Sequence, residues 1–293
     1  MISVAVRPNG FIAVTFSAMA SPCEIILNTS DLDLATKMGQ AAADEVHRIE
    51  VKYSRYRSDS VLSQINRSAG TVCTVDDETA KLIDFSAHCH ALSDGLFDIT
   101  SGVLRRVWRF DCSDQVPTRA AVRAIKQHVG FDKISWQTPS LTLRQGMELD
   151  FGGIGKEYAA DCALARMGQI AKIPALVNLG GDLCCNKAPE QGCWQVGVER
   201  PGSDRAPVMV LDLASGALAT SGDTHRFLLK QGKRYSHILN PRSGWPIDGG
   251  PRSVTVAAPS CIEAGMIATF ALLQGAQAEQ FLSEQGVQYW CLW

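Results

Sequence analysis

Short apolar runs alternate with amphipathic stretches along the whole chain, and this alternation limits the fold to a mixed architecture. Residues 11–17 and 23–28 have strand length and flank Met19–Pro22, which predicts a β-hairpin. Residues 31–50 place apolar side chains at spacings of three and four, which predicts a helix with Ser30 as its N-cap. The chain therefore combines both kinds of element from its beginning.

The rest of the sequence continues this interleaving and contains no internal repeat or low-complexity linker. Further helices are predicted over residues 77–92, from Thr118 to just before Gly130, and over 156–167, 260–274 and 276–285. Further strands are predicted over residues 175–179, 193–199, 207–213, 234–239, 252–258 and 288–293. We expect a single intertwined α+β domain over residues 1–293.

Composition excludes several classes of function. The 293 residues are 46% hydrophobic, as in a globular protein, and their net charge of −2 argues against a nucleic-acid partner. No apolar run has the roughly 18–20 residues that span a bilayer. A secretory signal is absent from the sequence or has been removed, and none of the ten cysteines forms a C-x-x-C pair. We therefore expect reduced thiols, no zinc site and a cytoplasmic location.

Residues 150–158, DFGGIGKEY, form the first candidate for a ligand-binding segment. They predict a strand end, a glycine turn and a helix start, where free N–H groups can receive an anion. Glu157 follows Lys156, so the segment is not a phosphate-binding P-loop, and it lacks the G-x-G-x-x-G pattern. A tight strand–helix turn without a ligand explains the segment equally well.

The second half of the chain contains further polar groups at strand or helix ends. Gly180–Asp182 and Ser221–Asp223 fit either a turn or a β-bulge. His237 ends a predicted strand, and its imidazole is suited to accept a proton near pH 7, although a lone histidine is more often structural. Ser260–Glu263 is a capping box, and Thr269 lies later on the same predicted helix.

Eight segments of the chain combine polar side chains with glycine or other small residues. They are SAMASPCEI (17–25), SRYRSDSVLSQIN (54–66), SDGLFDITSGVL (93–104), LDFGGIGKEYAAD (149–161), ALVNLGGDL (175–183), ATSGDTHRF (219–227), YSHILNPRSGWPI (235–247) and EAGMIAT (263–269). In this order they resemble the segments of the FAD:protein FMN transferase family. Each segment by itself is weak evidence for the family, whereas eight segments in the family's order are specific evidence for it. The resemblance implies an α+β fold with mixed or antiparallel strands and flanking helices.

The resemblance also implies roles for individual residues. His237 matches the family's proposed base, and the backbone carbonyl of Gly153 and the side chain of Thr269 match Mg²⁺ ligands. The positions that match contacts to FAD are Met19, Tyr56, Leu96, Phe97, Asp98, Asp150, Lys156 and Ile238.

One position departs from the family pattern. Gly265 stands where the family carries a metal-binding aspartate, four residues before Thr269. Asp182, Asp223, Glu263 or the phosphates of FAD are candidates to replace the missing carboxylate. Either an aspartate at position 265 restores metal binding, or the glycine makes room for another group and an aspartate there destabilises the helix.

The resemblance implies a Mg²⁺-dependent transfer of FMN from FAD to a Ser or Thr hydroxyl in a short motif of an acceptor protein. AMP would leave, and a phosphoester bond would hold the flavin. Two alternatives remain at this point. One is an FAD-binding carrier or regulator without transfer activity, which Gly265 favours. The other is an FAD pyrophosphatase that uses water as the acceptor.

Overall fold

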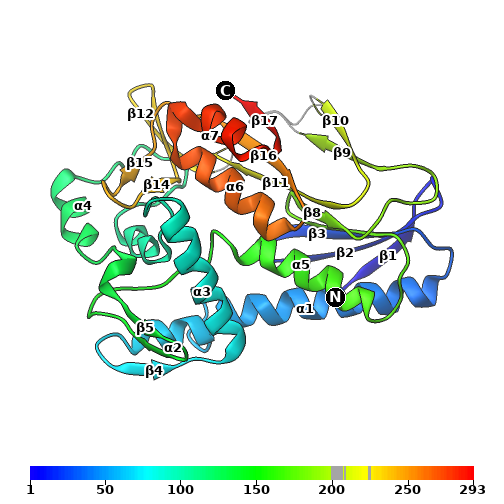
Figure 1. The fold of residues 1–293 in the computed structure, drawn as a ribbon, viewed down its shortest axis with the longest axis horizontal. Helices are drawn as coiled ribbons and strands as arrows, with labels where there is room; N and C mark the ends of the chain where they lie inside the picture. The colour runs from blue at the N-terminus through cyan, green and yellow to red at the C-terminus, as the bar shows by residue number, and fades with distance from the viewer. Residues whose placement is uncertain (199–206, 208, 224–225) are drawn as a thin grey trace.

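A long antiparallel sheet joins the beginning and the end of the chain. The computed structural model describes residues 1–198, 207, 209–223 and 226–293. Within these residues eight strands form one sheet, and each pair of neighbours is antiparallel (Figure 1). In order across the sheet they are β1 (Ser3–Val6), β2 (Ile12–Ala18), β3 (Ser21–Leu27), β7 (Ala175–Leu179), β8 (Asp182–Cys185), β11 (Gly216–Gly222), β16 (Ser253–Ala258) and β17 (Gln288–Leu292).

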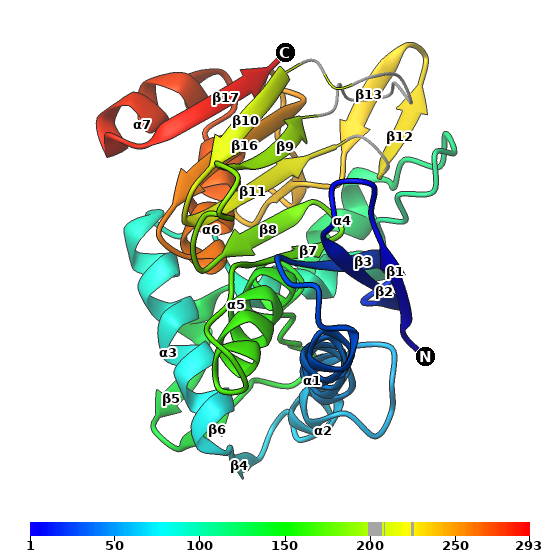
Figure 2. The ribbon, with the colours of Figure 1, turned by 90° about the vertical axis from the view of Figure 1, so that its right-hand side faces the viewer.

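Three helices cover one face of this sheet. α1 (Leu32–Tyr53) packs on β2 and β3, α5 (Gly155–Gly168) on β7 and β8, and α6 (Cys261–Leu273) on β11 and β16. α5 contacts both of the other helices, so it lies between them (Figure 2). Alternate strand residues enter this helix-covered core, Ile25 and Val177 among them. The helix that follows the glycine-rich segment is therefore central to the molecule.

The opposite face of the sheet is covered by a hairpin of β9 (Trp194–Val198) and β10 (Met209–Leu213). Trp194 packs there with Ile26 and Leu176, which are the strand neighbours of the residues that face the helices. Both faces of the central sheet are therefore buried, which confirms the α+β fold and its antiparallel strands.

The remaining elements surround this core. They are α2 (Val61–Arg67), β4 (Val72–Thr74), α3 (Asp77–Leu92), η1 (Ile99–Arg106), α4 (Arg119–Lys126), η2 (Phe131–Lys133), β5 (Ser135–Gln137), β6 (Ser140–Thr142), β12 (Phe227–Lys230), β13 (Lys233–Ser236), β14 (Leu239–Asn240), β15 (Trp245–Pro246), η3 (Gly275–Gln277) and α7 (Ala278–Gln285). Among the described helices none is long and apolar enough to cross a membrane.

The predicted hairpin and the helix over residues 77–92 are confirmed, and three predicted boundaries are corrected. The N-cap of α1 is Asp31 rather than Ser30, because the Asp31 carboxylate accepts a hydrogen bond from the Leu34 amide. α4 ends at Lys126, where a tighter turn begins. The strand predicted over 234–239 breaks between β13 and β14, because the Ser236 hydroxyl accepts from the Ile238 amide and bends the chain.

Residue 199 of the strand predicted over 193–199 and residue 208 of the strand predicted over 207–213 lie outside the described residues. The same holds for residues 224–225 of the segment 219–227.

Candidate functional site

Two hairpin turns lie side by side at one edge of the helix-covered face. Met19 has a φ of 52° in the β2–β3 turn, a left-handed conformation that is uncommon for a residue with a side chain. The Met19 amide donates to the Glu50 carboxylate over 2.6 Å, which holds this turn against α1. In the β7–β8 turn the Gly180 amide donates to the Pro22 carbonyl over 3.1 Å. The half-buried Met19 therefore lies beside the GGD turn.

The GGD segment is a two-residue hairpin turn rather than a bulge. Leu179 pairs with Asp182 across it, and Gly180 and Gly181 have φ values of 64° and 100°, which glycine adopts without steric cost. The turn places the buried Asp182 carboxylate 2.6 Å from the ammonium group of Lys156. Burial opposes the charge on Lys156, but the carboxylates of Asp182 and Glu157 together outweigh it and raise the pKa of this lysine.

The glycine-rich segment is held at its start by Asp150. Its backbone amide donates to the Ile99 carbonyl over 2.8 Å, and its carboxylate accepts from the Gly152 amide and forms an ion pair with Arg55. Arg55 also donates to the Tyr56 hydroxyl over 2.9 Å. Asp150 and Tyr56, which were predicted separately, are thus connected through Arg55, a residue that the sequence analysis did not select although it lies in the segment SRYRSD.

Phe97 connects the same segment with α6. A Cβ atom at Gly153 would lie 3.2 Å from the Phe97 ring, and that ring stacks edge-on against Phe270 with 6.0 Å between the ring centres. Phe270 follows Thr269 in the chain. The contacts of Phe97 with Gly153 and with Phe270 therefore bring Gly153 and Thr269 into the same region. Leu96, beside Phe97, is half-buried.

Asp98 has a structural function that its partners define. Its buried carboxylate accepts from the Thr100 amide, the Thr100 hydroxyl and the Phe131 amide, at 2.8, 2.6 and 3.0 Å. Asp98 therefore caps η1 and connects it to Phe131, the first residue of η2.

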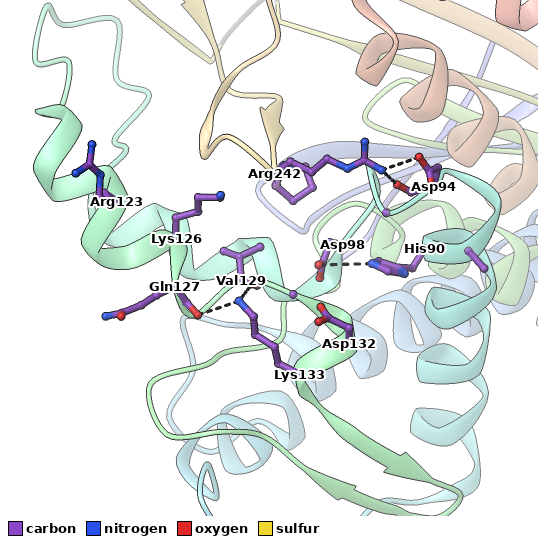
Figure 3. A pocket seen from close by; sticks show the side chains of 14 residues that line it. His90, Asp94, Asp98, Arg123, Lys126, Gln127, Val129, Asp132, Lys133 and Arg242 are labelled. Atoms are coloured by element: carbon purple, nitrogen blue, oxygen red, sulfur yellow. Dashed lines mark hydrogen bonds and ion pairs between the residues drawn. The ribbon is translucent and has the colours of Figure 1, made fainter.

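Asp98 also lines a cavity of about 710 Å³, together with His90, Asp94 and Arg242 (Figure 3). The Arg242 guanidinium donates to the Asp94 carboxylate over 2.7 Å, which joins the segments 93–104 and 235–247. His237, Lys156 and Thr269 do not line this cavity.

His237 is a neutral imidazole with one defined hydrogen bond. Its Nδ1 lies 3.2 Å from the Arg226 carbonyl oxygen, which only accepts, so Nδ1 carries the hydrogen and Nε2 presents a lone pair. Burial and the charge of Arg226 lower the pKa of His237 to about 4. The Lys156 charge acts on this pKa in the same direction and the Asp223 carboxylate in the opposite one. Ile238 follows and packs into the core.

Gly265 makes room for another side chain. A Cβ atom at this position would lie 2.6 Å from Cγ and 2.9 Å from Oε1 of Glu157, so the glutamate occupies that space. Glu157 is 7% exposed, and its Oε2 has no hydrogen-bond partner among the described residues. Burial, followed by the Asp182 charge, raises the pKa of Glu157. Thr269, one turn beyond Gly265, shares a 3.0 Å hydrogen bond with Ser221 of β11.

Glu157 was not among the predicted site residues, although the sequence contained a signal for it. With Ala160, Ala163 and Met167 it forms the buried stripe of α5, and a charged residue on such a stripe is unusual. The three carboxylates that were predicted as candidates to replace the missing aspartate are paired with other groups or exposed. Asp182 is paired with Lys156, the Asp223 carboxylate binds Arg234 and Arg252 at 2.8 and 2.7 Å, and Glu263 is exposed.

Comparisons with known proteins identify the family of this chain. The ApbE family model matches residues 19–291. A protein of Klebsiella pneumoniae named FAD:protein FMN transferase is 32% identical over 89% of this chain and 81% of its own length. An Escherichia coli protein of the same name is 29% identical over 80% of this chain and 70% of its own length.

Solved structures give the same result. The ApbE protein of Thermotoga maritima has a TM-score of 0.87 at 27% identity and covers 96% of this chain and 94% of its own. The apo flavinyl transferase ApbE of Pseudomonas stutzeri has a TM-score of 0.84 at 25% identity, with 99% and 91% covered. The sequence of this chain and its architecture therefore make it a member of the ApbE family.

Proposed function

We propose that this protein transfers FMN from FAD to a Ser or Thr hydroxyl of an acceptor protein and releases AMP. The observation that carries the proposal is His237, whose Nδ1 faces the Arg226 carbonyl so that Nε2 can accept a proton, in a chain that also contains the Lys156–Asp182 ion pair. The relatives from Klebsiella pneumoniae and Escherichia coli bear the name of this activity.

The residues around this centre fit a bound FAD. Lys156 offers a positive charge, and the N-terminus of α5 offers free amides, both of which suit the anionic pyrophosphate. Met19 and Tyr56 are assigned to the isoalloxazine ring. The Arg55 guanidinium lies over one face of the Tyr56 ring, 5.1 Å from its centre, and the 80% exposed side chain leaves the other face open for stacking. Leu96, Phe97, Asp98, Asp150 and Ile238 are assigned to the walls of the same site.

His237 is assigned as the base. Its Nε2 lone pair accepts the proton of the acceptor hydroxyl, and the hydroxyl oxygen attacks the phosphorus of the FMN half of FAD. The bond from this phosphorus to the bridging oxygen breaks, and AMP leaves with the electron pair. Negative charge on bound FAD raises the proton affinity of His237 from its low value in the free protein, because an opposite charge favours the imidazolium.

We assign the Mg²⁺ site to single oxygen atoms of the chain, since the described residues contain no group of three or more His, Cys, Asp or Glu side chains that could hold a metal ion. The Gly153 carbonyl and the Thr269 hydroxyl are assigned as ligands, and the unpartnered Glu157 Oε2 shows that a buried oxygen nearby lacks a partner. Mg²⁺ prefers such oxygens and stabilises charge on phosphate groups when bound.

We propose a cytoplasmic location and a single working unit over residues 1–293. None of the ten cysteines, all of which lie in the described part of the chain, forms a disulfide, which suits a reducing compartment. The acceptor is a protein that presents a Ser or Thr in a short local motif.

A mass measurement tests the function. The protein is incubated with FAD, Mg²⁺ and a candidate acceptor, with the same acceptor carrying Ala for Ser or Thr as control. Gain of one FMN by the first acceptor alone, with equimolar AMP, is the expected result. Release of free FMN and AMP without modification would indicate a pyrophosphatase, and intact FAD would indicate a flavin carrier.

A further inference from the structure

The contact between α5 and α6 places a carboxylate where the sequence led us to expect none. Glu157 extends from the first turn of α5 into the space beside Gly265 on α6. Any side chain at position 265 would overlap it, since the Cβ atom alone would lie 2.6 Å from Glu157 Cγ. The two positions therefore share one volume, and Glu157 fills it.

The buried carboxylate is incompletely satisfied. Its side chain is nine-tenths or more buried, and Oε2 has no hydrogen-bond partner within the described ranges. The nearest charged partner of suitable sign, Lys156, is engaged with Asp182 at 2.6 Å. A buried acceptor without a partner costs about 1–3 kcal/mol, so such a group commonly indicates an absent ion or water.

Oxygen donors converge on the same place. Thr269 lies one turn after Gly265, and side chains four apart on a helix lie on one face with about 5–6 Å between their Cβ atoms. The Ser221 hydroxyl is 3.0 Å from the Thr269 hydroxyl. A carboxylate together with hydroxyl oxygens is the donor set that a hard divalent cation prefers.

We propose that Glu157 is the carboxylate ligand of a divalent cation in this protein. The Glu157 side chain reaches the cation from α5 through the space beside Gly265 on α6, and Thr269 is a second protein ligand. The inference rests on the proposed function, because that function gives the cation its place beside the phosphates of FAD. The proposal places the carboxylate ligand on α5, whereas the family pattern places it on α6.

Binding of Mn²⁺ as a probe tests this assignment. The free Mn²⁺ signal in electron paramagnetic resonance is titrated with wild-type protein, Glu157→Gln and Glu263→Gln, each with FAD present. Glu157→Gln keeps the shape of the side chain but removes its charge, and we expect it to weaken Mn²⁺ binding by more than about tenfold. Glu263→Gln makes the same chemical change on an exposed side chain of α6 and should leave the affinity unchanged.

Thermal unfolding controls for loss of folding. In EDTA, Glu157→Gln should unfold at or above the wild-type temperature, whereas added Mg²⁺ should raise the midpoint of the wild type alone. The double variant Glu157→Gly with Gly265→Asp should regain Mn²⁺ binding, because its carboxylate enters the vacated space.

Two results would overturn the proposal: a wild type that does not bind Mn²⁺, or a Glu157→Gln variant that binds as the wild type does. The proposed function fails separately, if the wild type binds Mn²⁺ through Glu157 but transfers no FMN to any hydroxyl acceptor.

Discussion

Substitution of Gly265 by aspartate provides a direct test of the packing between α5 and α6. The new Cβ atom would lie 2.6 Å from Glu157 Cγ, closer than carbon atoms pack in proteins. Overpacking of a core position costs about 1–3 kcal/mol. A second carboxylate at about 4 Å adds about 4 kcal/mol at an effective dielectric constant of 20, and protonation of one acid relieves part of this.

We therefore expect Gly265→Asp to lower the free energy of unfolding by about 3–5 kcal/mol without metal. Since about 1 kcal/mol shifts the midpoint of a chain near this size by about 2–4 °C, the midpoint should fall by about 10 °C. Differential scanning calorimetry in EDTA measures the shift. Gly265→Ala adds the methyl group alone and gains about 1 kcal/mol of helix propensity, so its loss should be about 0–2 kcal/mol.

The double variant Glu157→Gly with Gly265→Asp completes a mutant cycle. It removes the steric overlap. The double variant should therefore be about 2–3 kcal/mol more stable than the sum of the two single substitutions predicts. A Gly265→Asp protein that unfolds at the wild-type temperature in EDTA would refute the reasoning. Additive effects in the cycle would show that the two positions do not share one volume.

Three further predictions concern His237 and Asp161. His237→Ala should lower FMN transfer by about 10²–10⁴ while FAD affinity stays within about tenfold; wild-type turnover at saturating FAD would make His237 structural. The pKa of His237 is lowered to about 4 by burial and by Arg226, so the unfolded chain binds the proton more readily. The wild type should therefore lose stability as the pH falls from about 6.5 to 4, and urea unfolding should show a smaller loss for His237→Ala. The Asp161 carboxylate accepts from the Cys261 and Ile262 amides at 2.9 and 3.0 Å, so Asp161→Ala should cost about 1–3 kcal/mol in urea unfolding; an unchanged midpoint would contradict this.

Local patterns in the sequence were sufficient to predict many elements. The helix over residues 77–92 and the strand over 175–179 have the predicted bounds, because apolar periodicity and caps act over a few neighbouring residues. The hairpin around Met19 was predicted from two apolar runs. Short strands such as β1 and β12 were not predicted, because three or four residues carry too little periodicity.

The ordered motifs indicated which residues gather at the site, and the roles assigned to them there stay predictions. Tertiary structure decided how those residues are held. Asp150 and Tyr56 are joined by Arg55, and Asp98 caps η1. These partners are distant in the chain, and no local pattern couples them.

The clearest division concerns Gly265. The sequence alone showed that position 265 has no carboxylate. It left open whether the glycine removes a metal ligand or makes room for another side chain. The fold decided the question by packing α5 against α6, so that Glu157 enters the space beside Gly265. Spacing along one helix is set by covalent geometry and can be read from residue numbers. Proximity between two helices depends on the order of the strands beneath them, which arises only when the whole sheet assembles.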